Sequence, residues 1–200
     1  MSAGLLMLAA LWAGWCALHS LLASLHVHRW LRRRLGPAYR YYRLFYNAFA
    51  VFSLLPVLAY GRRLQEAPFL AWHGGWHLLQ GLMIAGALYL FIAPLRHYDM
   101  SRFLGLQQLS GEVDGAGLDG GGEFCTAGIL GRCRHPWYSG ALLLIWARDL
   151  DGATLVTNVV LSLYLVLGAR LEERKLLAEF GDAYRRYRQA VPMFIPRWRS

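Results

Sequence analysis

Charged residues are scarce in this chain of 200 residues. They make up only 16% of the sequence, whereas 56% of the residues are hydrophobic. A soluble domain usually carries about 25% charged residues. Acidic residues are the scarcest, with 12 aspartates and glutamates against 21 lysines and arginines. The lack of charge excludes an ordinary soluble domain and predicts a single membrane domain over residues 1–200.

Cysteine is also rare, since the sequence contains only Cys16, Cys125 and Cys133. No two of them form a Cys-x-x-Cys pair, so the zinc and thioredoxin motifs are missing, and three are too few for a disulfide scaffold. The histidines offer no better support for a metal. His73 and His77 are four residues apart, but the sequence suggests no third ligand, and we predict no metal site.

Five apolar segments predict membrane helices. About 20 residues at 1.5 Å per residue span a hydrocarbon core of roughly 30 Å. The first segment lacks the basic flank of a signal peptide, so we expect it to be retained. The last two are joined by a tight turn. We place the spans at about 5–25, 44–60, 76–95, 137–147 and 154–169. The predicted fold is therefore all-α and integral to the membrane, with a short C-terminal helical hairpin and an amphipathic tail over 170–200.

Basic residues are unequally distributed among the connections between these spans. Most of them lie in the first connection, in the connection 96–134 and in the tail 170–200. The other side has only Arg62, Arg63 and Arg148. Because connections rich in lysine and arginine stay in the cytoplasm, we expect the N-terminus outside and the C-terminus cytoplasmic. The same rule explains the net charge of +9 better than nucleic-acid binding, which we do not expect.

Two polar motifs adjoin predicted spans on the cytoplasmic side. The stretch from Arg134 through His135 and Pro136 to Gly140 opens the fourth span. Proline suits the first turn of a helix, and the free amides there can hold an anionic group. Glu172 and Glu173 close the fifth span, where carboxylates beside hydrocarbon are usually functional or paired. Both motifs have plainer explanations, because Arg134 and His135 could be a snorkelling basic pair and the glutamates could pair with a neighbouring arginine.

Two other patterns have simpler interpretations. Tyr39, Tyr41, Tyr42 and Tyr46 near the entry of the second span are typical of an aromatic belt at the membrane interface. The glycine-rich run 111–122 lacks the preceding strand and the spacing of a dinucleotide-binding fingerprint. We expect it to form a flexible part of the connection 96–134, which could cover a site.

The order of the C-terminal motifs resembles a known superfamily. Between about Phe124 and Pro196, Arg-His-Pro-x-Tyr-x-Gly, a short hairpin, Glu-Glu-x-x-Leu, Phe-Gly-x-x-Tyr-x-x-Tyr and Val-Pro follow one another. This pattern resembles the isoprenylcysteine carboxyl methyltransferase superfamily. Its relatives include phospholipid methyltransferases, methanethiol S-methyltransferases and NnrU-type membrane proteins. Segments of the N-terminal half look most like the methanethiol methyltransferase and NnrU-like branches.

The resemblance implies S-adenosylmethionine as the cofactor. Matched residue by residue, it implies that the cofactor-binding residues are Phe124, Cys125, Leu130, His135, Pro136, Trp137, Tyr138 and Glu172. Leu130 replaces a tyrosine that is common in the prenylcysteine branch. Gly168 stands where that branch has a substrate-binding arginine, so we do not expect a prenylcysteine substrate.

The resemblance further implies methyl transfer to a small or lipophilic acceptor, for which we expect a thiol. Glu172 would balance the positive charge of the cofactor, and Arg134 or Arg170 would lower the pKa of the thiol. The expected partners are this acceptor and the lipid bilayer, here of a bacterial inner membrane. Two alternatives remain open, a non-enzymatic NnrU-type protein of nitrogen-oxide metabolism and a nicotinamide-dependent membrane reductase of related fold.

Overall fold

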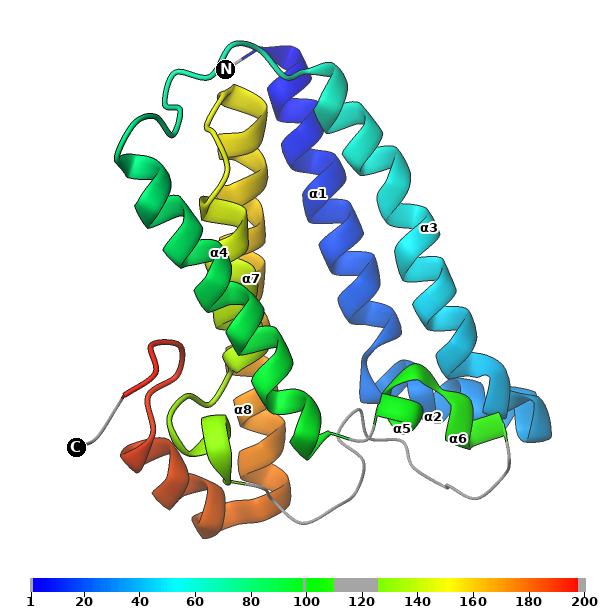
Figure 1. Ribbon diagram of the computed structural model, residues 1–200. Helices are drawn as coiled ribbons and strands as arrows, with labels where there is room; N and C mark the ends of the chain where they lie inside the picture. Colours follow the sequence, from blue (N-terminus) through cyan, green and yellow to red (C-terminus); the bar gives the residue numbers. More distant parts are fainter. Residues whose placement is uncertain (1, 99, 110–125, 198–200) are drawn as a thin grey trace. The chain divides into compact units, whose positions relative to one another are not determined.

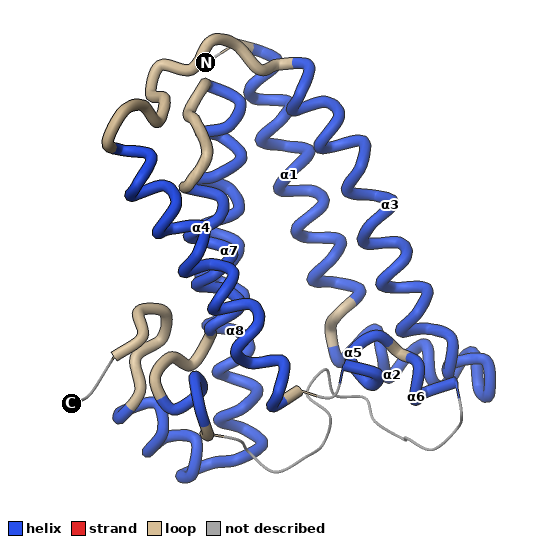
Figure 2. The backbone as a smooth tube through the Cα atoms, in the orientation of Figure 1, coloured by secondary structure: helices blue, strands red, loops and turns tan. Residues whose placement is uncertain are grey.

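The computed structural model describes residues 2–98, 100–109 and 126–197, which fold almost entirely into helices (Figures 1 and 2). Within these ranges, the only β interaction is an isolated antiparallel bridge between Leu70 and Leu150. The chain divides into two compact units. Unit 1 comprises residues 1–64 and 98–123, and unit 2 comprises residues 65–97 and 124–200.

Among the residues described here, four helical stretches are long and apolar enough to cross a membrane, namely Ala3–Leu22, Leu25–Arg63, Trp76–His97 and Gly152–Ala190. They confirm the predicted all-α integral membrane fold. The fourth predicted span is the helix α7 (Pro136–Trp146), which has 11 residues. At 1.5 Å per residue it is about 16 Å long, roughly half of a hydrocarbon core. It is short because Pro136 starts it and a polar turn with Arg148, Asp149 and Asp151 follows it.

Unit 1 is built on an antiparallel pair of long helices, α1 (Ala3–Leu22) and α3 (Tyr42–Arg63), which lie side by side in Figure 1. Four short helices cross one end of this pair: α2 (Leu25–Leu35), η1 (Gly36–Tyr41), α5 (Met100–Leu104) and α6 (Leu106–Leu109). Ser24 caps α2, since its hydroxyl accepts a hydrogen bond from the amide of Val27. The chain therefore leaves α1, crosses this end as α2 and enters α3.

The tyrosines expected in an aromatic belt mostly face the inside of unit 1. Tyr42 and Tyr46 are buried, and their hydroxyls hydrogen-bond to the carbonyl of Leu22 at 2.7 Å and to Nε2 of His19 at 2.8 Å. The Tyr39 hydroxyl lies 2.6 Å from Nδ1 of His28. Residues 39, 42 and 46 share one side of the chain because their spacing follows the helical repeat. Of the four tyrosines, only Tyr41 is exposed.

Unit 2 packs α7 closely against α4 (Trp76–Ile92), which continues as η2 (Ala93–His97). A Cβ atom on Gly140 would lie only 3.1 Å from the carbonyl oxygen of Ala87, so this glycine permits the close approach. Two hydrogen bonds tie the same pair of helices together. The indole of Trp137 donates to the carbonyl of Phe91 at 3.0 Å, and the amide of Gln80 donates to the carbonyl of Ala147 at 2.9 Å.

Asp151 begins α8 (Gly152–Ala190) and holds the preceding connection in place. Its carboxylate accepts hydrogen bonds from the amide of Thr154 at 2.6 Å and from the amide of Glu66 at 2.9 Å. Burial alone would raise the pKa of Asp151, but these hydrogen bonds hold it below its ordinary value. Asp149 acts similarly, since it accepts from the amide of Trp72. The turn between α7 and α8 is thus fixed to the segment before α4.

The helix α8 is longer than we expected. We expected the last span to end near Ala169, with Glu172 and Glu173 at the helix end, but α8 runs through both residues. Between Ala169 and Phe180 the sequence contains only leucine, alanine, phenylalanine and charged residues that tolerate a helix, with no glycine or proline. The helix bends only at Gly181, which has φ 53°, and the predicted amphipathic tail is its continuation.

Part of the connection 96–134 is helical. Besides η2, α5 and α6, it contains the short helix η3 (Gly128–Gly131). The glycine-rich run 111–122 lies outside the described residues.

We predict that Gly140→Val weakens the packing of α7 against α4. The new side chain must displace the backbone of Ala87 or the ring of Phe91, and overpacking of this kind costs about 1–3 kcal/mol. Thermal unfolding of the protein in detergent should therefore shift to lower temperature by several degrees. Gly81→Val is the matched control, because nothing lies within 4 Å of a Cβ atom at Gly81 in the same helix pair. Equal melting temperatures for the two variants would contradict this packing.

Candidate functional site

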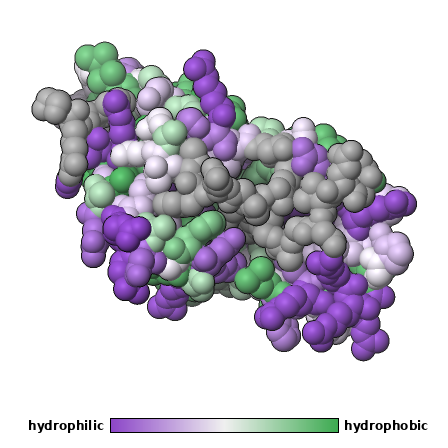
Figure 3. Space-filling view, turned by 90° about the horizontal axis from the view of Figure 1, so that it is seen from below, coloured by the Kyte–Doolittle hydropathy of each residue, from purple (hydrophilic) through white to green (hydrophobic). Residues whose placement is uncertain are grey.

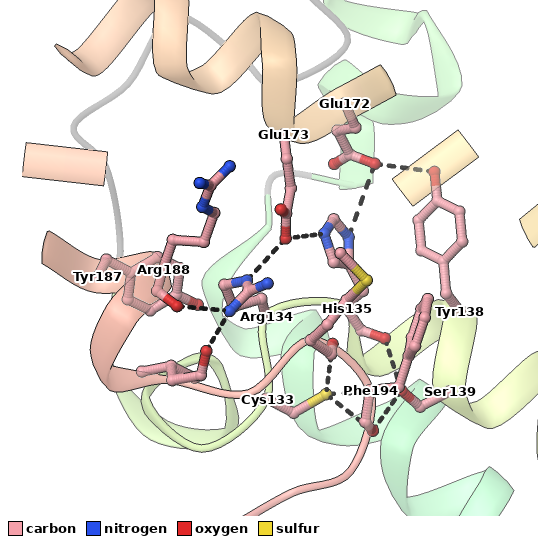
Figure 4. A network of polar contacts seen from close by, with 12 residues as sticks. Cys133, Arg134, His135, Tyr138, Ser139, Glu172, Glu173, Tyr187, Arg188 and Phe194 are labelled. Carbon is pink, nitrogen blue, oxygen red and sulfur yellow. Dashed lines mark hydrogen bonds and ion pairs between the residues drawn. The ribbon is translucent and has the colours of Figure 1, made fainter. Parts of the chain in front are cut away.

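A network of polar side chains joins the start of α7 to the middle of α8 (Figure 4). Its centre is Glu173, whose Oε1 accepts hydrogen bonds from Nε of Arg134 at 2.7 Å and from Nε2 of His135 at 3.2 Å. The side chains of Arg134 and Glu173 are only 8% and 6% exposed. A buried charge is tolerated when it is paired and hydrogen-bonded, and here each member of the pair satisfies the other.

Glu172 reaches a second set of partners. Its Oε2 accepts a hydrogen bond from the hydroxyl of Tyr138 at 2.8 Å and lies 3.8 Å from Nδ1 of His135. Successive residues of a helix point about 100° apart, so Glu172 and Glu173 face different partners. Glu172 is also less enclosed, since its side chain is 33% exposed. The two neighbouring carboxylates therefore differ in surroundings, since Glu173 is buried and Glu172 is partly exposed.

His135 lies between the two carboxylates. Its side chain is 3% exposed, and burial lowers its pKa below the ordinary 6.5 even though Glu173 raises it. The imidazole is therefore neutral at neutral pH. Because a carboxylate can only accept, we assign the ring proton to Nε2, which faces Glu173. The nitrogen Nδ1 is then a hydrogen-bond acceptor on the side of Glu172.

The C-terminal segment folds back along Arg134 and His135 and fixes their backbone. The amides of Arg134 and His135 donate to the carbonyls of Pro192 and Met193, each at 3.0 Å. The guanidinium of Arg134 also donates to the carbonyl of Arg188 at 2.8 Å and to that of Val191. The C-terminal segment thus holds the backbone of Arg134 and His135 and the side chain of Arg134 in place.

A second set of contacts connects the tail to α7. The hydroxyl of Ser139 donates to the carbonyl of Phe194 at 2.6 Å, and the ring centroid of Phe194 lies 6.2 Å from that of His135. The fully buried Cys133 donates from Sγ to the same carbonyl at 3.2 Å. Cys133 therefore fills a structural position. Burial raises the pKa of its thiol, which keeps it un-ionised.

The structure brings together four of the side chains predicted for the site, namely Arg134, His135, Tyr138 and Glu172. Pro136 is buried at the first position of α7. Trp137 instead directs its indole nitrogen to the carbonyl of Phe91 in α4. Gly168 packs on the ring of Tyr138, since a Cβ atom there would lie 3.4 Å from it.

The remaining predicted residues have other surroundings or are not described. Arg170 is exposed, and two residues along a helix turn it about 200° away from Glu172. Leu130 is buried in η3, where its carbonyl accepts a hydrogen bond from the hydroxyl of Tyr187 at 2.6 Å. Phe124 and Cys125 lie outside the described residues.

Glu173 and Phe194 take part in the network, although neither was among the predicted catalytic or cofactor-binding residues. The sequence marked Glu173, like Glu172, as a carboxylate that is functional or paired with a neighbouring arginine, and in the structure its arginine is Arg134. No sequence signal identified Phe194, because its contact with His135 depends on the return of the tail. Among the residues that the structure describes, no three histidine, cysteine or acidic side chains are arranged to hold a metal ion.

We predict that Glu173→Gln destabilises the protein by about 3–5 kcal/mol, because it leaves the buried charge of Arg134 without its counter-charge. Thermal unfolding in detergent measures this loss. Glu179→Gln serves as the control, since Glu179 is an exposed glutamate of the same helix. Equal stability of the two variants would show that the pair contributes nothing to the fold.

The pKa of His135 predicts a dependence of stability on pH. Because the folded state holds this imidazole neutral below its ordinary pKa of 6.5, the unfolded state binds the proton more readily. The contribution of His135 is therefore complete above about pH 6.5 and is lost as the pH falls below it. Melting temperatures measured between pH 7.5 and pH 5 should fall more steeply for the unaltered protein than for His135→Gln. Parallel curves would refute this assignment.

Comparison with known proteins identifies relatives of part of the chain. No family model matches the chain, and no solved structure matches it significantly. Methanethiol S-methyltransferase 1 of Bradyrhizobium diazoefficiens is 43% identical over 67 residues, which are 33% of this chain and 23% of that protein. Methanethiol S-methyltransferase 2 of the same organism is 33% identical over 123 residues, or 60% of this chain and 46% of that protein.

A third relative, the methanethiol S-methyltransferase of Pseudomonas deceptionensis, is 36% identical over 76 residues, or 38% of this chain and 29% of that protein. The matches span less than half of the length of each of these relatives. They confirm the predicted resemblance to the isoprenylcysteine carboxyl methyltransferase superfamily and to its methanethiol S-methyltransferase branch.

Proposed function

We propose that the protein is a membrane methyltransferase that uses S-adenosylmethionine to methylate a small, lipophilic thiol. The proposal depends mainly on one observation. Where α7 begins beside α8, Glu172 lies within 2.8 Å of the hydroxyl of Tyr138 and 3.8 Å from Nδ1 of His135. The similarity to methanethiol S-methyltransferases supports the reaction type and the thiol acceptor.

The chemistry of this group of residues suits the cofactor. The carboxylate oxygen of Glu172 and Nδ1 of His135 are two hydrogen-bond acceptors 3.8 Å apart. A ligand that donates hydrogen bonds to both of them would stabilise this arrangement. A cationic ammonium is such a donor, and a carboxylate beside the hydrocarbon is stabilised by positive charge. When bound, S-adenosylmethionine supplies an electrophilic methyl group on a sulfonium, which adds a second positive charge.

Each residue of the network then has a distinct role in the proposed site. Glu172 binds the cationic part of the cofactor, and the hydroxyl of Tyr138 orients the carboxylate. Glu173 holds the ring of His135, and it also holds Arg134, which fastens the tail. Because Arg134 is engaged by Glu173 and by two carbonyls of the tail, we assign it a positioning role. Arg170 lies on another face of α8, and we leave it out of the site.

We also propose an orientation in the membrane. Glu172 lies about 20 residues, and so about 30 Å, along α8 from Gly152, which is the thickness of a hydrocarbon core. The site would thus lie at one membrane surface, and the distribution of arginines supports the cytoplasmic surface, with the N-terminus outside. A water-soluble cofactor would enter there, while the apolar acceptor would arrive from the bilayer of a bacterial inner membrane.

Binding of S-adenosylhomocysteine to the purified protein tests the proposal. We expect micromolar binding by calorimetry, weakened about tenfold or more in Glu172→Gln because a charge-assisted hydrogen bond is lost. Glu179→Gln, an exposed change in the same helix, should bind normally. Labelled S-adenosylmethionine should then methylate methanethiol with the unaltered protein and fail to do so with Glu172→Gln.

Other outcomes would favour the two alternatives. Binding of a nicotinamide nucleotide in place of S-adenosylhomocysteine would favour a membrane reductase. Folded protein that binds neither compound would favour a non-enzymatic NnrU-type role, and would overturn the proposed function.

A further inference from the structure

Gly168 is the only glycine of α8 between its first residue, Gly152, and the bend at Gly181. Glycine is among the least favourable residues inside a helix, because its backbone loses the most freedom on folding. Gly168 lies where the apolar part of α8 meets the charged part that begins at Arg170. The charged part lies low in Figure 1, and Figure 3, which is seen from below, shows many hydrophilic side chains on that side. A glycine at this boundary therefore needs an explanation from packing.

The ring of Tyr138 explains this glycine. Outside the backbone of α8 and the two adjacent residues, a Cβ atom at Gly168 would have only two described atoms within 4 Å, namely Cε1 and the hydroxyl oxygen of Tyr138, at 3.4 and 3.8 Å. Gly140 differs, because a Cβ atom there would meet the backbone carbonyl of Ala87 in another helix. Gly168 therefore makes room for one side chain rather than for the close approach of two helix backbones.

The phenol of Tyr138 lies along about one turn of α8. Gly168 and Glu172 are four residues apart, which places them about 40° apart around the helix and about 6 Å apart along it. The ring contacts α8 at Gly168, and its hydroxyl donates a hydrogen bond of 2.8 Å to Oε2 of Glu172. A larger side chain at position 168 would stand between the ring and the helix, and would move the hydroxyl away from the carboxylate.

His135 borders the same ring from the start of α7. Its ring centroid lies 5.2 Å from that of Tyr138, and the two planes meet at 82°, which is an edge-to-face arrangement. The ring of Tyr138 is therefore held between His135 and the backbone of α8 at Gly168. Its hydroxyl is thereby held at Oε2 of Glu172, the oxygen that lies 3.8 Å from Nδ1 of His135.

We infer that Gly168 is a positioning residue of the site, which acts on Glu172 through the ring of Tyr138. Because Gly168 has no side chain, the ring lies against α8, and the hydroxyl then holds the carboxylate beside His135. The inference rests on the proposed function, in which this carboxylate binds the cationic part of the cofactor. It adds that the affinity for the cofactor depends on a residue that has no side chain to contact it.

Calorimetric titration with S-adenosylhomocysteine tests the inference. Gly168→Val puts two methyl groups on a carbon that already contacts the ring, and the stiff valine side chain cannot turn both of them away. We expect this variant to bind about tenfold more weakly, as should Tyr138→Phe, which removes a hydrogen bond to a charged group. Gly168→Ala adds only one atom at ordinary contact distance, and should recover most of the affinity.

Two further variants separate positioning from a general loss of packing. The double variant Gly168→Val/Tyr138→Phe should bind no more weakly than Tyr138→Phe, because both changes remove the same hydrogen bond. Gly81→Val should bind as the unaltered protein does, since no described atom lies within 4 Å of a Cβ atom at Gly81 in α4. Additive losses in the double variant, or equal losses in Gly168→Val and Gly81→Val, would overturn the inference.

A measurement without ligand separates the inference from the proposed function. In protein labelled at Cζ of tyrosine, the NMR signal of Tyr138 reports on its hydroxyl, and its absence from Tyr138→Phe assigns it. The signal should move in Glu172→Gln and in Gly168→Val, and an unmoved signal in Gly168→Val would overturn the inference. If the unaltered protein does not bind S-adenosylhomocysteine, the proposed function fails, and this signal alone decides whether Gly168 positions Tyr138.

Discussion

One buried carboxylate oxygen holds the site together. Oε1 of Glu173 accepts hydrogen bonds from both Arg134 and His135, which come from a segment almost 40 residues earlier in the chain. Through Arg134 the same oxygen also fixes the tail, because that guanidinium donates to carbonyls of Arg188 and Val191. A buried ion pair gains little over an apolar core but is costly to break, so it defines one arrangement of these segments.

The short length of α7 explains why a carboxylate is required at the position of Glu173. Since α7 has only 11 residues, its start lies beside α8 rather than beyond the end of a full membrane span. Arg134 and His135 precede it and must be accommodated beside apolar helices, where unpaired charge is unfavourable. Glu173 neutralises the arginine, and the neutral state of His135 avoids a second charge. Glu172 is then the more exposed acidic group of the network.

Buried arginines in both units are held by acceptors of the protein itself. In unit 2, Arg134 is buried and paired with a carboxylate. In unit 1, Arg43 is buried against Phe103, to whose carbonyl it donates at 3.0 Å, while the arginines of α2 are exposed. A buried guanidinium needs acceptors from its own protein, whereas an exposed one can bind phosphate from the surroundings.

The sequence by itself determined the class of the fold and the main motif. Long apolar runs require helices, because backbone groups in hydrocarbon must form their hydrogen bonds within one segment. Pro136 correctly marked the start of α7, and His135 and Glu172, which belong to two separate C-terminal motifs, lie close together in the structure.

Only the tertiary structure decided which charges are buried and which partners they have. Glu172 and Glu173 are identical and adjacent in sequence, and the rotation of α8 against α7 alone makes one the buried partner of Arg134. Arg170 looked suitable by proximity, but the same rotation turns it outward. Tyr42 and Tyr46 face His19 and the end of α1 because α3 packs against that helix. These outcomes depend on helix phase and on contacts between distant segments, which local sequence does not encode.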